Sequence, residues 1–330
     1  MENPFPKSTS AAEKVKRLFS TVGQDDTVAV LINADPDALS SALALKRMFW
    51  RKVKKTSIFR INAVKRADNL AMVKLLKIDN QHIRKLNSAE YTRWAIVDSQ
   101  PHHNPQFGKH RFDIIIDHHP PGPGVKAPYV DIKDDYGATA TLMIEYLRAA
   151  RIRPSPRLAT ALFYGIKTDT ENFARPTTEG DIKAFRYLYP FVNTHIIKKI
   201  ESSEFTKKTL ANFREALDRY AIIRNRAFVH MGTVNDPDVL VMIADFFLRV
   251  AEASWSIVSG VYGQKLIVIF RSAGFRREAG KLAQDLFGEW GTAGGHQSAA
   301  RAEVALQDLG DAAKDDETLA KFVQDRVRNI

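Results

Sequence analysis

The sequence has 330 residues, 45% of them hydrophobic, and 49 Lys or Arg against 38 Asp or Glu give a formal net charge of +11. It has no cysteine, which excludes disulfides, thiolate metal sites and cysteine nucleophiles. No apolar run reaches the roughly 20 residues that span a bilayer, and no signal-peptide segment begins the chain. We therefore expect a cytoplasmic protein of two domains, with a positive charge that favours polyanions such as nucleic acid.

Strand-like and helical segments alternate through the first two hundred residues. An amphipathic helix capped by Ser8, Thr9 or Ser10 comes first. Four strands are then expected at 27–32, 56–61, 93–98 and 112–117, with helices at 38–50, 67–77, 137–150 and 178–201. This alternation predicts a parallel α/β sheet. The uniform β-branched run 114–116 is typical of a strand that is buried on both faces.

Acidic residues follow the first strand. Asp35 and Asp37 lie two residues apart in the turn before the helix, so both side chains can face one cation. Ser40 and Ser41 lie near the start of that helix, where free N–H groups attract anions.

Three further acidic positions follow apolar segments. Asp98 ends one predicted strand, and the triplet Asp117-His118-His119 ends a second one. Asp169 follows an apolar helical stretch. The triplet alone is explained equally well as a polar loop. Because open α/β sheets bind ligands at the carboxyl ends of their strands, the combination predicts a metal centre.

Carboxylate and imidazole ligands suit manganese or magnesium. Two such ions about 3.5–4 Å apart can hold the attacking and leaving oxygens of a phosphoryl displacement. We expect Asp98 to bridge them and a metal-activated water to be the nucleophile.

The second half of the chain has a different pattern. We predict a metal-binding domain over 1–203, a linker over 204–224 and a smaller mixed α/β domain over 225–330, with a hairpin turning at Gly263-Gln264. Segment 239–247 is interpreted as strand-rich or mixed.

The C-terminal domain contains a glycine pair followed by histidine, Gly294-Gly295-His296. Two glycines let backbone N–H groups approach a phosphate, to which His296 can hydrogen-bond. Alone, the triplet is more often a loop with an incidental histidine. Arg271, suited to bidentate phosphate contact, and Ser272 favour a substrate clamp; Arg276 and Arg277 are weaker candidates.

These motifs together resemble the DHH phosphoesterases of the RecJ-like superfamily, in particular the two-domain nanoRNase/pAp-phosphatase branch. The matching phrases are NADPDALSS (33–41), VDSQ (97–100), DHH (117–119), YGATATLMIEYL (136–147), GIKTDT (165–170), FRS (270–272) and GTAGGHQSAARAEV (291–304).

The resemblance implies one or two manganese or magnesium ions and an active site in the cleft between the domains. The expected metal ligands are Asp35, Asp37, Asp98, His118 and Asp169. Catalytic roles go to His118, His119 and Asp98, and Asp117 and Asn33 would orient the ligands. The expected substrate-binding residues are Arg271, Ser272, Gly294, Gly295 and His296.

The implied activity is hydrolysis of short oligonucleotides (nanoRNA), of 3'-phosphoadenosine 5'-phosphate, or of both. The expected partner is thus a short single-stranded oligonucleotide or a nucleotide. We expect no association with a membrane, and a homodimer is an open alternative to a monomer.

One position departs from the family. Leu31 occupies the place of a metal-ligating histidine in the first motif, and an alternative alignment puts the missing histidine at Asn33. The alternative function is therefore a catalytically degenerate scaffold that binds or senses nucleotides or oligonucleotides. His102 and His103 are the candidates to compensate for the missing histidine. The retained carboxylates favour the enzyme, because a pure binding protein does not need the whole set.

Overall fold

The structure is a computed structural model that describes residues 10–175, 177–203, 206–273 and 278–328. The chain divides into two compact units, Met1–Glu204 and Phe205–Ile330, and each is described by itself. We call them the N-terminal unit and the C-terminal unit.

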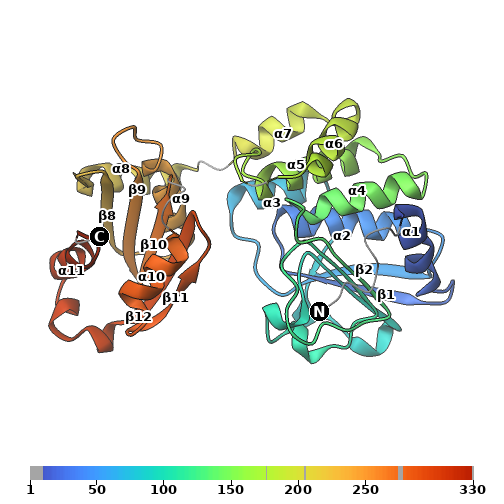
Figure 1. The fold of residues 1–330 in the computed structure, drawn as a ribbon, viewed down its shortest axis with the longest axis horizontal. Helices are drawn as coiled ribbons and strands as arrows, with labels where there is room; N and C mark the ends of the chain where they lie inside the picture. Colours follow the sequence, from blue (N-terminus) through green and yellow to red (C-terminus); the bar gives the residue numbers. More distant parts are fainter. Residues whose placement is uncertain (1–9, 176, 204–205, 274–277, 329–330) are drawn as a thin grey trace. The chain divides into compact units, whose positions relative to one another are not determined.

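The N-terminal unit contains a six-stranded, fully parallel sheet in the order β3-β2-β1-β4-β5-β6, which confirms the predicted fold class (Figure 1). Its strands are β1 (Thr27–Ile32), β2 (Lys55–Arg60), β3 (Gln81–His82), β4 (Arg93–Val97), β5 (Ile114–Asp117) and β6 (Tyr129–Ile132). The strand order reverses between β1 and β4. Such a reversal opens a crevice at the carboxyl ends of the strands.

Seven α-helices belong to the described part of this unit. They are α1 (Ala11–Ser20), α2 (Pro36–Phe49), α3 (Ala67–Leu75), α4 (Thr139–Ala149), α5 (Pro156–Asp169), α6 (Glu179–Leu188) and α7 (Thr194–Glu201). The 3-10 turns are η1 (Ile83–Lys85), η2 (Ser88–Glu90), η3 (Pro101–His103), η4 (Phe107–Lys109) and η5 (Tyr189–Phe191). Ser10 caps α1, because its hydroxyl accepts the Glu13 N–H. Of the three predicted caps, Ser10 is therefore the one that the structure shows.

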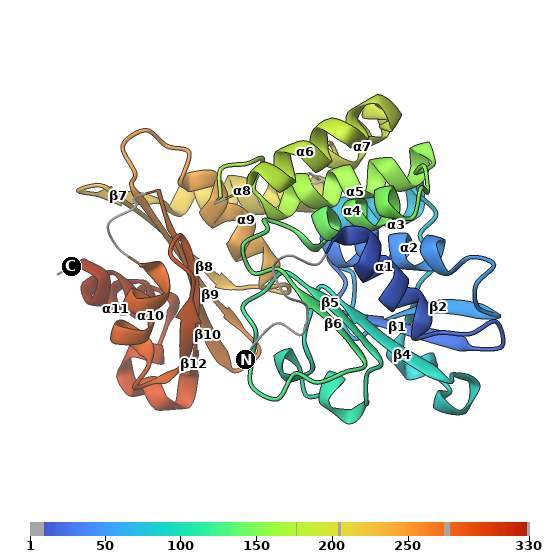
Figure 2. The same cartoon turned by 45° about the vertical axis from the view of Figure 1, so that its right-hand side comes forward.

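The two faces of this sheet are covered differently. Val28, Val30 and Ile32 face the core formed with the helices, which lie on one side of the strands (Figure 2). The alternate residues Ala29 and Leu31 pack on the other face, against a cluster that includes residues of the irregular segments 83–91 and 107–112. Both faces are therefore buried, as the apolar strand runs predicted.

The C-terminal unit has a mixed six-stranded sheet in the order β11-β12-β10-β9-β8-β7, in which only the β8–β9 pair is parallel. Its strands are β7 (Ala221–Ile223), β8 (Arg226–Thr233), β9 (Trp255–Tyr262), β10 (Lys265–Ser272), β11 (Gly291–Gly295) and β12 (Ala299–Ala305). Its helices are α8 (Lys207–Arg219), α9 (Asp238–Phe247), α10 (Ala279–Phe287), η6 (Leu306–Ala313) and α11 (Asp316–Arg328). Residues of α8 and α9 pack on one face of this sheet, and α10 and α11 pack on the other.

In the segment 204–224, predicted as the linker, α8 and β7 occupy most of the described part, and Phe213 packs in the core of the C-terminal unit. One expectation for this region is corrected. Segment 239–247 is helical within α9 and not strand-like. The hairpin at Gly263 is confirmed, with a φ of +61° there. Arg276 and Arg277 lie outside the described residues.

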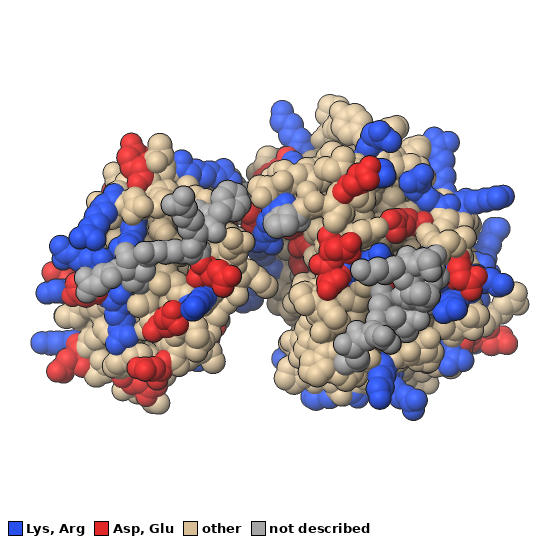
Figure 3. Space-filling view, viewed as in Figure 1, with Lys and Arg blue, Asp and Glu red and all other residues tan. Residues whose placement is uncertain are grey.

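No helix in the described ranges is long and apolar enough to cross a membrane. Acidic side chains are interspersed among the basic ones on the face shown in Figure 3, so the net positive charge does not form one continuous field there.

Candidate metal centre

The predicted metal ligands converge at one edge of the parallel sheet. Asp35 and Asp37 follow β1, Asp98 follows β4, and His118 follows β5, and these three strands are neighbours. Asp169 is the last residue of α5 and therefore reaches the site from a helix end and not from a strand end.

Close packing of α5 on α2 brings Asp169 into this group. A Cβ atom at Gly165 would lie 2.5 Å from the Ser40 Oγ atom and 3.2 Å from the Asp37 Cα atom. Glycine at this position therefore allows the two helices to approach beside Asp37.

His118 is held with one ring nitrogen facing the acids. Its Nδ1 atom lies 2.9 Å from the Tyr136 carbonyl, which can only accept, so Nδ1 carries a proton and donates. In the neutral ring the Nε2 lone pair then points 3.0 Å from Asp169 Oδ2 and 3.6 Å from Asp98 Oδ1. Nε2 is buried and has no hydrogen-bond partner among the described residues. A lone pair that faces carboxylates requires a proton or a cation between them.

The side chains of Asp37 and Asp98 are fixed by the start of α4. Asp37 accepts the N–H groups of Thr139 at 2.6 Å and Ala140 at 2.8 Å, and Asp98 accepts the Thr139 hydroxyl at 2.8 Å. Asp98 has a φ of +58°, in the left-handed region. Such backbone conformations gather at functional sites, where surrounding contacts hold them in place.

The spacing of these groups fits a cation. The ligand atoms of Asp37, His118 and Asp169 lie within 4.8 Å of one another, as do those of Asp98, His118 and His119. Six ligands at about 2.1 Å from an ion lie about 3–4 Å apart, so modest closure of these groups makes a site. The set of carboxylates and imidazole suits manganese or magnesium.

The electrostatics of the cluster agree with this fit. Burial and the charge of Asp169 raise the pKa of Asp37 to about 6. Burial and then Asp37 raise the pKa of Asp98 well above its usual value. Burial lowers the pKa of His118, but the contact with Asp169 and the charge of Asp37 outweigh it and raise that pKa to about 10. Without a metal, bound protons reduce the negative charge of this cluster. A divalent cation at the same place could replace them.

Asp117 holds the ring of His119 in position. It is fully buried, and its Oδ1 atom lies 2.8 Å from Nδ1 of His119. Gln100, also fully buried, donates to Asp117 Oδ2 at 2.7 Å and accepts the Gly122 N–H at 2.8 Å. The two contacts fix the loop after β5 and leave Nε2 of His119 as its outward-facing nitrogen.

The first-motif residues are arranged less favourably for a second ion. Leu31 is fully buried and belongs to the apolar cluster on the other face of the sheet. Asp35 caps α2 by accepting the Ala38 N–H at 2.8 Å, and burial with the charge of Asp37 raises its pKa to about 7. Asn33 is exposed. Among the described residues, no group spaced for a metal includes Asp35.

His103 lies close to Asp117 and His119, as a compensating ligand would require. Its Nδ1 atom accepts the Gln100 N–H at 3.2 Å, however, so the neutral ring carries its proton on Nε2. This tautomer makes His103 a hydrogen-bond donor and not a metal ligand. His102 is exposed.

A turn over residues 136–141 organises the whole centre, and sequence reasoning did not assign its anchor. Asp181 is fully buried and accepts the Gly137 N–H at 3.0 Å and the Thr141 hydroxyl at 2.6 Å. It also accepts the N–H and hydroxyl of Thr178. The capping-box spacing from Thr178 to Asp181 was a local signal, but it does not reveal the contacts to the turn.

The predicted phosphate-binding residues gather in the C-terminal unit. Arg271 pairs with Ala299 across β10 and β12, and the Ser272 N–H donates to the Ser298 carbonyl, so both residues lie one strand away from Gly294 and Gly295, with β12 between them. Arg271 donates to Asp245 at 2.6 Å, and His296 is exposed.

The two glycines of that segment belong to β11 and not to a loop. A Cβ atom at Gly295 would lie 2.3 Å from the Ala299 carbonyl oxygen, so strand pairing explains this glycine. A Cβ atom at Gly294 would meet nothing within 4 Å.

Similar proteins are known. An uncharacterized protein of Methanocaldococcus jannaschii, MJ1633, is 33% identical over 298 residues, which are 90% of this chain. This chain spans 61% of the length of that relative.

Two solved structures share the fold. An exopolyphosphatase-related protein from Bacteroides fragilis has a TM-score of 0.72 at 17% identity, covering 96% of this chain and 100% of that one. RecJ from Thermus thermophilus, in complex with Mn²⁺, has a TM-score of 0.57 at 14% identity, covering 99% of this chain and 56% of that one.

The family model of the DHH family, N-terminal domain, matches residues 27–166, which contain β1 to β6 and all the predicted metal ligands except Asp169. The predicted resemblance to the DHH family is confirmed for residues 27–166, which match the N-terminal domain of that family.

Proposed function

We propose that this protein is a manganese-dependent phosphoesterase that hydrolyses short oligonucleotides, 3'-phosphoadenosine 5'-phosphate, or both. The observation that carries the proposal is the buried Nε2 atom of His118, which faces Asp98 and Asp169 and has no hydrogen-bond partner within the described ranges. The manganese bound to the structurally similar RecJ supports the choice of ion.

The ion would be held by Asp37, Asp98, His118 and Asp169. When bound, it supplies the charge that polarises a phosphoryl oxygen and lowers the pKa of a water molecule. We propose one tightly held ion, because Leu31 offers no ligand atom and Asp35 is already engaged as a helix cap.

The chain's own residues prepare the reaction in two ways. Tyr136 and Thr139 orient His118 and Asp98, so the ligands need little rearrangement. His119 is held by Asp117, and the side chain of His119 is 42% exposed, so its Nε2 atom can reach a substrate oxygen and hold a proton there. We propose that Arg271, Ser272 and His296 contact the phosphate of the substrate, as the C-terminal contribution.

The test is an assay of the purified full chain with manganese on a dinucleotide, a pentanucleotide, 3'-phosphoadenosine 5'-phosphate and pyrophosphate. We expect turnover of the dinucleotide or of 3'-phosphoadenosine 5'-phosphate, abolished by chelation. Activity that survives exhaustive chelation would exclude the metal mechanism.

The second candidate is a degenerate scaffold that binds nucleotides without hydrolysis, and the buried Leu31 favours it. It predicts saturable binding of the same compounds with no turnover at any manganese concentration. The assay and a binding measurement on one preparation separate the two functions.

A further inference from the structure

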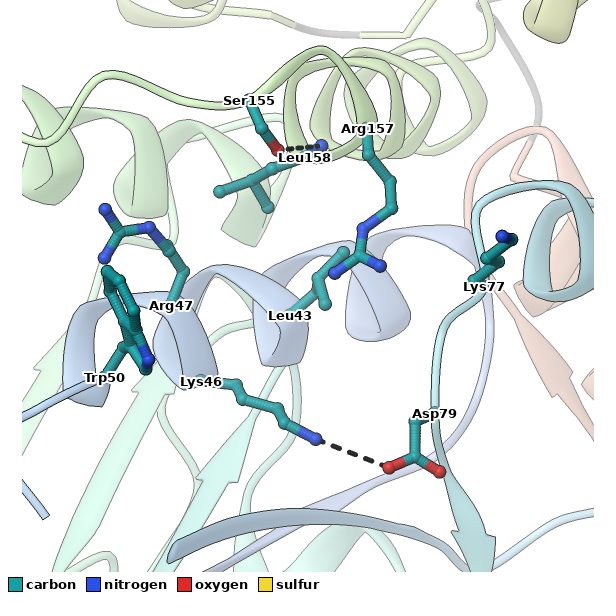
Figure 4. A pocket seen from close by; sticks show the side chains of 9 residues that line it. All are labelled: Leu43, Lys46, Arg47, Trp50, Lys77, Asp79, Ser155, Arg157 and Leu158. Carbon is teal, nitrogen blue, oxygen red and sulfur yellow. Dashed lines mark hydrogen bonds and ion pairs between the residues drawn. The ribbon is translucent and has the colours of Figure 1, made fainter. Parts of the chain in front are cut away.

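A cavity of about 420 Å³ lies in the N-terminal unit, away from the metal centre. Its volume is in the range of small-molecule sites, roughly 300–1,000 Å³. Side chains from α2, from the segment after α3 and from the start of α5 line it (Figure 4). They are Leu43, Lys46, Arg47, Trp50, Lys77, Asp79, Ser155, Arg157 and Leu158.

Two antiparallel helices separate this cavity from the metal centre. Helix α2 begins at Pro36, beside the ligand Asp37, and its 14 residues lead away to the cavity over about 21 Å. Helix α5 begins at Pro156, beside the cavity, and ends on Asp169. One small ligand cannot reach both places.

The cavity has an excess of positive charge, and helix ends explain only part of it. Lys46 and Arg47 lie in the last turn of α2, where cations stabilise the helix dipole. Arg157 is the second residue of α5, where a cation faces the positive end of a helix. The single carboxylate among the lining residues, Asp79, is paired with Lys46 at 3.5 Å.

Lys77 lies just past the C-terminus of α3, where a cation is favourable, but its backbone conformation is unusual for a lysine. Its φ of +48° lies in the left-handed region, and it follows α3 where glycine is usually found. No ion pair involves Lys77 or Arg157 in the part of the chain that the structure describes. The cavity is thus lined by two cations without an acidic partner among the described residues, and this suits an anionic ligand.

The remaining walls are apolar and aromatic. Leu43 and Leu158 are buried, and Trp50 is 57% exposed with the Arg47 guanidinium 4.9 Å from its ring centre. In Figure 4 the Arg157 guanidinium lies over Leu43, with Trp50 on one side and Lys77 on the other. The cavity thus combines phosphate-binding groups with a flat apolar wall, which is the chemistry of a nucleotide.

We propose that this cavity binds a free nucleoside monophosphate, with its phosphate at Arg157 and Lys77 and its base against the side of the cavity formed by Trp50 and Leu43. Asp79 and Ser155 are placed to hydrogen-bond the sugar. The same chemistry is present in the terminal nucleotide of an oligonucleotide, and the titration below distinguishes the two ligands. The proposal does not depend on hydrolysis at the metal centre.

The test is calorimetric titration of the full chain with AMP in excess chelator, so that the metal centre is not loaded. We compare wild type with Arg157→Ala, Lys77→Gly and a control, Arg111→Ala, which removes an exposed arginine outside the cavity. Lys77→Gly suits the left-handed backbone, so this variant is expected to fold. Thermal melts verify folding of all three.

We expect wild type and Arg111→Ala to bind AMP equally, and each cavity variant to bind at least tenfold more weakly. Inorganic phosphate and adenosine should each bind at least tenfold more weakly than AMP. Failure of AMP to bind, or equal binding by the folded cavity variants, overturns the proposal. Phosphate binding as tight as AMP reduces the cavity to a simple anion site, and tighter binding of the dinucleotide pApA assigns it to an oligonucleotide end; either result overturns the mononucleotide assignment.

Discussion

The Asp37 carboxylate accepts the backbone N–H of Thr139 at 2.6 Å, so a proposed metal ligand on α2 is also the cap of α4. The charge of Asp37 is placed at the positive end of a helix, which favours its ionised form. Burial and the charge of Asp169 act in the other direction and raise the pKa of Asp37 to about 6. The N–H groups thus hold the carboxylate in position, while burial and Asp169 disfavour its negative charge. A bound cation would remove that unfavourable electrostatic energy.

Asp98→Asn should separate metal binding from folding. The pKa of Asp98 is raised well above normal by burial and by Asp37, so asparagine imitates the protonated form, and asparagine also tolerates the φ of +58°. We expect an unchanged or higher Tm without metal, loss of the manganese-induced rise in Tm, and no turnover. Thermal melts with and without manganese measure this.

The control for that variant is Asp135→Asn, an exposed residue that should keep the full manganese effect. Near wild-type manganese stabilisation in Asp98→Asn would show that Asp98 is not a ligand. Asp98→Ala is a poorer choice, because alanine in the left-handed region costs roughly 1–2 kcal/mol.

The stabilisation by manganese should depend on pH. The pKa of Asp37 is raised to about 6, mainly by burial and Asp169, so the folded metal-free protein holds this proton more tightly than the unfolded chain. The proton on Asp37 therefore stabilises the folded metal-free protein. This stabilisation is complete below the unfolded pKa, near 3.8, and is lost as pH rises through about 6. For His118, whose pKa is raised to about 10, the loss extends from about 6.5 to about 10.

Because manganese competes with these protons, its effect on Tm should grow steadily between about pH 5 and about pH 8. Melts across this range at fixed free manganese test the sign. A shift that shrinks with rising pH, or does not change, would contradict the proton–metal competition.

Leu31→His tests whether a second ion can be restored. Leu31 packs in an apolar cluster, where an imidazole without a metal partner costs roughly 1–3 kcal/mol as an unsatisfied polar group. We expect a loss of stability of that size in urea unfolding and no gain in manganese affinity. A gain in affinity or in turnover at limiting manganese would show instead that position 31 reaches the first metal site.

Asp181→Ala should disturb the centre from a distance. The substitution leaves the buried Thr141 hydroxyl and the half-buried N–H groups of Gly137 and Thr178 without their acceptor, so we expect a loss of about 2–3 kcal/mol in unfolding free energy. Manganese affinity should also fall, because the same turn orients His118 and Asp37. The exposed Asp135→Ala, in the same segment, is the matched control.

Sequence patterns predicted the parallel sheet because its strands are short apolar runs that end on acids, as at Asp98 and Asp117. The candidate ligands were recognisable for the same reason. Gln100 and Asp181 were not assigned, because their partners Asp117 and Gly137 lie 17 and 44 residues away and no local spacing encodes such contacts. Helix α9 was interpreted as strand-rich or mixed because a short, continuous apolar run has no decisive period.

The contact between Asp37 and Thr139 joins residues 102 positions apart in the chain. Loop-closure entropy makes such non-local contacts slow to form, so the centre is completed late in the folding of the N-terminal unit. During synthesis, a nascent chain that ends before Asp169 lacks one proposed ligand altogether. Capture of manganese during translation would therefore report that synthesis has passed α5 and that α2, α4 and α5 have assembled.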